Sequence, residues 1–185
     1  MLHFQNLRNQ WRSFQEDRTG GATIEFVLCL PLFVFLFTIA FEAGLMSTRQ
    51  VMLEHGMTQT VRNIRIGAIR NIDGQTLIQE ICEQATIIPD CTNQVRIEMI
   101  PISIDQWDTS LITGEAQCRN RDEDDSEALL QPVFTGNNND MMFLRACALI
   151  DPMLPDIGIG KRMGDSEGGP YKLVTSTAYV LEPFQ

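Results

Sequence analysis

Residues 20–46 read GGATIEFVLCLPLFVFLFTIAFEAGLM. Between Ile24 and Phe41, Glu25 is the only charged residue. An α-helix rises about 1.5 Å per residue, so roughly 20 residues suffice to cross the hydrocarbon core of a bilayer. The stretch therefore predicts a transmembrane helix over residues 21–46, in which Glu25 is the anomalous side chain.

The alternative is a cleaved secretory signal, which has an apolar core of about 7 to 15 residues followed by an A-x-A-like site. The apolar run here is longer, and residues 40–43 read AFEA, which does not supply such a site. We therefore interpret the run as a retained membrane span.

Basic residues precede the span. The first 20 residues carry the arginines Arg8, Arg12 and Arg18. After the span, Arg49 lies between Glu42 and Glu54. Because a Lys/Arg excess marks the cytoplasmic side of a membrane helix, the pattern predicts a cytoplasmic leader over residues 1–20 and places residues 47–185 on the opposite side.

The chain is acidic. Its 185 residues carry a net charge of −10, and the part beyond the span has the length of one ordinary domain. An acidic surface repels phosphate backbones, so nucleic acid is not an expected partner. The densest acidic run, residues 122–127, lacks the alternating ligands and the glycine of a calcium loop, and we interpret it as a solvated loop.

Four of the five cysteines lie beyond the span, whereas Cys29 lies within it and is interpreted as a small apolar residue. An even set in an oxidising compartment predicts two disulfides among Cys82, Cys91, Cys118 and Cys147. Four cysteines allow three pairings. A short Cys82–Cys91 link, between the end of a helical pattern and a proline break, is the simplest sterically, and it leaves Cys118–Cys147. No C-x-x-C spacing suggests a metal site.

Helical periodicity continues after the span. Apolar residues recur on one helix face at Leu53, Met57, Val61, Ile64 and Ala68. This face has two open interpretations, packing on the domain's own core or a subunit-contact seam. Gly56 and Gly67 predict a bend or an end nearby. A second helix is expected over residues 75–86. Its inward residues are Leu77, Ile78, Ile81 and Ala85.

Three later stretches have strand patterns. Residues 95–103, VRIEMIPIS, alternate in polarity, and Pro101 belongs at a sheet edge or a bulge because it cannot donate to a ladder. Residues 141–150 and 171–181 have similar patterns. Three strands covered by a helix predict a small α+β domain with an antiparallel sheet and long loops, of which residues 151–170 are rich in Gly and Pro.

Catalytic constellations are absent from the sequence. The chain has two histidines, His3 in the leader and His55 just beyond the span, and neither completes a Ser-His-Asp, Cys-His or H-E-x-x-H arrangement. Gly168 and Gly169 do not follow the strand-to-helix pattern of a phosphate loop. The sequence therefore predicts a protein without enzyme activity, metal or cofactor.

The start of the span resembles a known family. Residues 20–26, GGATIEF, with Leu30-Pro31-Leu32 and Arg49-Gln50, are similar to the TadE-like minor pseudopilins of the tight-adherence (Flp-type) pilus. Less specific resemblances to one subgroup of that family occur around Cys118, residues 145–148 and residues 176–178.

The resemblance implies a processing site. In this family a membrane prepilin peptidase cuts after a glycine, which corresponds to Gly20 and leaves Gly21 as the new N-terminus. Glu25 and Phe26 correspond to the recognition and assembly pair, with Phe26 in place of the tyrosine common in the major pilin. A new α-amino group at Gly21 would lie four residues before Glu25 on one helix face, or would meet the glutamate of an adjacent copy.

The resemblance also implies a structural function. The expected protein is a single-pass bacterial inner-membrane pseudopilin with a periplasmic domain, which either enters the pilus or primes its assembly. Its implied partners are the membrane, other pilin and pseudopilin subunits, the prepilin peptidase and the pilus assembly platform. The alternative is an uncleaved, TadG-like anchored binding or scaffold protein. An enzyme with an acidic cleft around residues 122–125 is a third interpretation.

Overall fold

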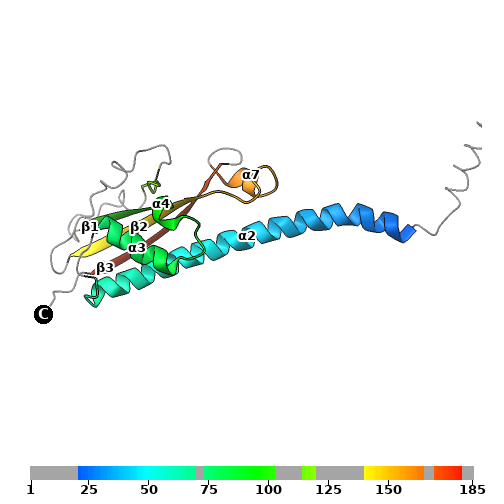
Figure 1. The fold of residues 1–185 in the computed structure, drawn as a ribbon. Helices are drawn as coiled ribbons and strands as arrows, with labels where there is room; N and C mark the ends of the chain where they lie inside the picture. The colour runs from blue at the N-terminus through cyan, green and yellow to red at the C-terminus, as the bar shows by residue number, and fades with distance from the viewer. Residues whose placement is uncertain (1–20, 70–72, 103–113, 120–139, 165–168, 181–185) are drawn as a thin grey trace, which may run out of the picture. The chain divides into compact units, whose positions relative to one another are not determined.

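The structure is a computed structural model, and it describes residues 21–69, 73–102, 114–119, 140–164 and 169–180 (Figure 1). The chain divides into two compact units, Met1–Phe41 and Glu42–Gln185. Helix α2 (Gly21–Arg65) contributes residues to both units. Residues 42–46, which the sequence pattern assigns to the end of the span, belong to the second unit.

The second unit combines short helices with a three-stranded antiparallel sheet of order β1-β2-β3. After α2, its elements are α3 (Gly74–Gln84), α4 (Cys91–Gln94), β1 (Val95–Ile102), β2 (Met141–Ile150), α7 (Gly160–Met163) and β3 (Tyr171–Val180). The predicted α+β class with a small antiparallel sheet is therefore confirmed.

The part of α2 that belongs to the second unit buries the predicted apolar face in the core of that unit. Its buried apolar side chains are Leu53, Met57, Val61 and Ile64. The prediction for Ala68 is wrong, because the helix ends at Arg65 and Ala68 is exposed. Gly67 has a φ of 72°, a backbone conformation that suits glycine and ends the helix, as its position suggested.

Helix α3 begins at a side-chain cap. The carboxylate of Asp73 accepts a hydrogen bond from the backbone N–H of Thr76 at 2.6 Å. This bond lowers the pKa of Asp73, because it stabilises the ionised carboxylate. Leu77, Ile81 and Ala85 are buried as expected, and Ile78 packs against the core while remaining partly exposed.

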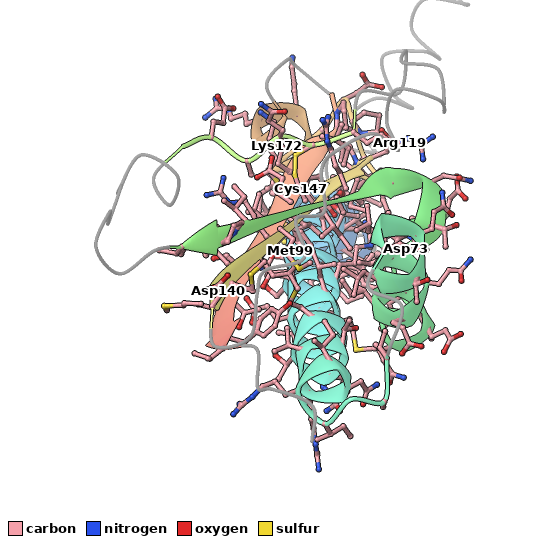
Figure 2. All side chains as sticks on the ribbon, turned by 90° about the vertical axis from the view of Figure 1, so that its left-hand side faces the viewer. Asp73, Met99, Arg119, Asp140, Cys147 and Lys172 are labelled. Carbon is pink, nitrogen blue, oxygen red and sulfur yellow. A yellow bond between two sulfur atoms is a disulfide. The ribbon has the colours of Figure 1, made fainter. Side chains whose placement is uncertain are left out.

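Strand β2 is the central strand and is buried on both faces. Its residues alternate between the two faces, as in any strand. One face joins the helices in a single core, and its members are Met142, Leu144, Ala146, Ala148 and Ile150. Figure 2 shows α2 and α3 together on this side of the sheet, with Met99 of β1 above α2.

The strand predictions are confirmed with small differences at the ends. Strand β2 has the predicted bounds, and β1 and β3 end at Ile102 and Val180. The last predicted residues, Ser103 and Leu181, lie outside the described residues. Pro101 is exposed on the edge strand β1, where a residue without an N–H does not interrupt the sheet.

Gly56 faces α3 at a close contact between the two helices. A Cβ atom built on Gly56 would lie 2.6 Å from the backbone oxygen of Ile81, whereas a Cβ on Gly44 would meet nothing within 4 Å. We expect Gly56→Ala to lower the free energy of unfolding by about 1–3 kcal/mol, because the helices must separate. The same change at Gly44 is expected to raise it by up to about 1 kcal/mol, through helix propensity.

This pair of variants is compared by urea unfolding of the detergent-solubilised protein with its disulfides oxidised. Both replace a helical glycine with alanine, so the difference between them reports the contact with α3. Equal shifts of the unfolding midpoint would contradict a close contact at Gly56.

Candidate functional site

The N-terminal part of α2 has the properties of a membrane anchor. By length and composition, α2 is the one helix in the described part of the chain that is long and apolar enough to cross a membrane, and its most apolar window is not buried by the protein. Its large apolar side chains from Ile24 to Phe41 are almost all exposed. Such a surface is compatible with lipid and supports membrane anchoring.

The predicted processing and assembly residues lie at the start of this helix. Gly21 is the first described residue, and Gly20 lies outside the described part, so the cut between them stays a prediction. Glu25 and Phe26 are both exposed. Since the helix is continuous from Gly21, the backbone nitrogen of Gly21 lies one turn before Glu25 on the same side.

An aromatic stripe, which the sequence analysis did not single out, follows this pair. The rings of Phe33 and Phe37 stack with their centroids 6.4 Å apart, and those of Phe37 and Phe41 are 6.5 Å apart. Phe26 precedes Phe33 by seven residues and therefore shares the same helix face. The signal in the sequence is the repeat of phenylalanine at helical spacing.

Glu42 is a second residue whose role the sequence analysis missed. It is buried, and its carboxylate accepts hydrogen bonds from the backbone N–H groups of Met153 at 2.8 Å and Leu154 at 3.2 Å. Two backbone donors satisfy a carboxylate that is removed from water. Glu42 therefore fastens the loop after β2 to the first turn of the second unit.

The residues Arg49 and Gln50, quoted for the family resemblance, connect α2 to β3. Arg49 donates a hydrogen bond to the Tyr171 hydroxyl at 2.9 Å, and Gln50 donates to the backbone oxygen of Val174 at 3.0 Å. These bonds join residues far apart in sequence. They fix the helix against the edge strand of the sheet.

A polar cluster covers the face of the sheet opposite the helices. Arg145 of β2 forms an ion pair with Glu98 of β1 at 3.5 Å, with 7% and 15% of their side chains exposed. Arg145 also donates to the backbone oxygen of Gly114 at 3.0 Å, and its guanidinium lies 5.2 Å from the ring centroid of Phe143. Gln117 donates its backbone N–H to Glu98 at 3.1 Å. The cluster thus holds residues 114–119 on the sheet.

Two disulfides join the pairs that the sequence favours. Cys82 and Cys91 link the end of α3 to α4, with Cα atoms 5.7 Å apart. Cys118 and Cys147 link the segment over the polar cluster to β2, with Cα atoms 5.0 Å apart. Cys29 is an exposed free cysteine in α2.

A polar groove runs beside β3. It has a volume of about 370 Å³, and its lining residues are Glu54, Met57, Thr58 and Val174–Thr177. Among the described residues, no group of three or more His, Cys, Asp or Glu side chains gathers to hold a metal ion. His55 is exposed, and the acidic run 122–127 lies outside the described part of the chain. The groove therefore presents hydroxyl groups and one carboxylate.

Comparison with known proteins gives one result. Residues 20–62 match the family described as TadE-like protein. The matched range contains Glu25, the aromatic stripe and the Arg49–Gln50 pair. Neither the curated proteins nor the solved structures contain a match to the chain.

Proposed function

We propose that this chain, which is TadE-like over residues 20–62 and thus associated with Tad pili, acts as a minor pseudopilin. The observation that carries the proposal is where the match begins. It starts at Gly20, directly before the exposed apolar part of α2, residues 21–41, whose single charge is Glu25. At the centre of a membrane helix a charged side chain costs about 2.5–3.5 kcal/mol, and an acid near the start of the apolar run still gains from a partner.

Cleavage after Gly20 would supply that partner. It creates an α-ammonium group at Gly21, one helical turn from Glu25. Within one chain the two charges neutralise each other, and between adjacent copies they set the register of packed helices. Because the dielectric is low away from water, helices packed with these two charges out of contact are disfavoured. The charge pair therefore favours one alignment of the packed helices.

The aromatic stripe would provide the packing surface of the assembled helix. Apolar helices gain little from the hydrophobic effect inside lipid, so their association depends on close packing and on polar contacts. Phe33, Phe37 and Phe41 present one continuous ridge along the helix. In this proposal the ridge packs on neighbouring pilin and pseudopilin helices, and Glu25 fixes their register.

The second unit would be a periplasmic head of the subunit, with the leader in the cytoplasm and the helix in the inner membrane. Two disulfides support this location, because they persist in oxidising compartments. The groups that cover the sheet are engaged in structural contacts, so we propose a scaffolding function and no catalytic one. The prepilin peptidase and the pilus assembly platform are the proposed partners in processing and assembly.

The decisive experiment is the intact mass of the protein extracted from membranes. In cells with an active prepilin peptidase, we expect a chain that begins at Gly21. In cells without the peptidase, and for a Gly20→Leu variant, we expect the full chain from Met1, because a bulky side chain would replace the glycine at the cut. A chain that begins at Met1 in the presence of the peptidase would favour the uncleaved, anchored scaffold instead.

A further inference from the structure

The segment Pro152–Met163, between β2 and β3, exposes large apolar side chains although it is firmly folded. Met153 is 57% exposed and Ile157 is 51% exposed. Pro152 and Gly160 are buried, and a Cβ atom on Gly160 would collide with the backbone oxygen of Leu154. The segment is therefore held in a compact turn that points two apolar side chains outward.

Glu42 fixes the position of this segment. Its carboxylate binds the backbone N–H groups of Met153 and Leu154 at 2.8 and 3.2 Å. Glu42 directly follows Phe41, the last residue of the exposed apolar run 24–41. The backbone of the segment is thus fastened to the residue at which the apolar run ends.

The lipid boundary is expected at this same level. From Ile24 to Phe41 the helix is about 27 Å long, close to the thickness of a hydrocarbon core. Beyond Glu42 the next apolar side chains are covered by protein, since Leu45 is partly buried and Met46 packs against the core. The second unit therefore covers part of the helix surface from Glu42 onward.

The charges of the segment suit a membrane interface. Asp156 of the segment and Asp151, which directly precedes it, are balanced by Lys161 and Arg162, and all four are exposed. The whole chain has a net charge of −10, so this balanced region is less repelled by anionic headgroups than the average surface of the protein. Apolar side chains flanked by charged ones are typical of elements that lie in the interface.

We propose that the segment Pro152–Met163 rests on the membrane surface beside Glu42 and inserts Met153 and Ile157 into the lipid interface. Glu42 acts as the positioning residue. The contact gives the head a second attachment to the membrane besides its helix. It requires the membrane anchoring of α2 but not a role in pili, so it stands or falls independently of the pseudopilin function.

Spin-label accessibility in proteoliposomes of the full chain tests this proposal. Single labels are placed by Met153→Cys, Ile157→Cys and the control Ile66→Cys, each in a Cys29→Ser background. Ile66 is a suitable control because it is 69% exposed and lies just after α2 ends, about 36 Å along the helix from Glu42. Collisions of each label with oxygen, which concentrates in lipid, are compared with collisions with a water-soluble nickel chelate.

We expect the ratio of oxygen to nickel collisions at positions 153 and 157 to exceed that at position 66 several-fold. Equal ratios at all three positions would overturn the proposal. The measurement is repeated with less than one chain per vesicle on average. If the protection from nickel at position 153 then disappears, a second copy of the chain covers the segment instead of lipid, and the proposal also fails.

The positioning role of Glu42 is tested by two variants carrying the label at position 153. Glu42→Ala removes both acceptor oxygens, and we expect the ratio to fall toward that of position 66. Glu42→Gln keeps one oxygen at the same reach, and we expect most of the ratio to remain. If the ratio of oxygen to nickel collisions at position 153 is the same in Glu42→Ala as in the protein that keeps Glu42, the positioning role is refuted. Should Glu42→Ala fail to fold, the comparison of labels in the native background still decides the lipid contact.

Discussion

Replacing Glu25 with leucine is expected to remove the mature, cleaved protein from the pilus fraction while leaving its membrane insertion intact. Leucine makes the helix more apolar, so anchoring in the bilayer improves. The α-ammonium group created at Gly21 then has no carboxylate to pair with when helices pack. The loss therefore falls on assembly alone.

The size of this effect follows from the cost of an unpaired charge in a membrane. The cost of about 2.5–3.5 kcal/mol that applies at the centre of a membrane helix is an upper bound here, and it corresponds to a decrease of the assembled fraction by at most on the order of 100-fold, since about 1.4 kcal/mol changes an equilibrium tenfold. The measurement is the ratio of protein in sheared pili to protein in membranes, determined by immunoblot. An isosteric Glu25→Gln variant should behave like the leucine variant if the charge itself is required.

Glu54→Gln is the matched control, because it removes a carboxylate from the exposed surface of the same helix. We expect it to leave the pilus fraction unchanged. Wild-type levels of Glu25→Leu in sheared pili would refute the register function of Glu25. Absence of the unsubstituted protein from pili, with cleavage intact, would instead indicate a protein that primes assembly without entering the fibre.

Replacing Arg145 with methionine is expected to cost the second unit about 3–5 kcal/mol of unfolding free energy. Methionine preserves the apolar stem of arginine but leaves Glu98 without its ion pair in a largely buried site. The backbone oxygen of Gly114 also loses its donor. Urea unfolding of the full chain in detergent, with oxidised disulfides, measures the loss as a shift of the midpoint at constant slope.

Lys172→Met is the matched control, because Lys172 forms a shorter ion pair, 2.8 Å, with Glu115, whose side chain is 82% exposed. Despite the shorter distance, we expect a cost below about 1 kcal/mol, since water screens an exposed pair. The double variant Arg145→Met with Glu98→Met should be more stable than Arg145→Met alone, because no buried charge remains unpaired. A larger effect at Lys172 than at Arg145 would contradict the importance of burial.

Local patterns in the sequence predicted most of the fold. The apolar run, the helical spacing from Leu53 to Ile64 and the strand over residues 141–150 each reflect a repeat that neighbouring residues set by themselves. The prediction failed at Ala68, where the apolar spacing continued but Gly67 ended the helix. A backbone preference therefore outweighed the hydrophobic pattern at that position.

Some residues of the candidate site could likewise be recognised from the sequence, and others could not. Gly20, Glu25 and Phe26 could be recognised from sequence because they are consecutive parts of one short motif, and the match at residues 20–62 agrees with that resemblance. Nothing in the sequence pattern marks Glu42 as the partner of Met153, a residue 111 positions later. Similarly, Arg145 reads as a polar residue of a strand until the structure shows what covers it.

The sequence by itself therefore determined the apolar helix, the order of α2, α3 and the three strands, and the motif at the start of α2, because each depends on residues within a few turns of one another; the short helices α4 and α7 were not predicted. The tertiary structure alone decided that Glu42 holds the Pro152–Met163 segment at the end of the apolar run and that Arg145 is buried with Glu98. These contacts arise only when distant segments meet. Their strength depends on exclusion of water, which no local pattern encodes.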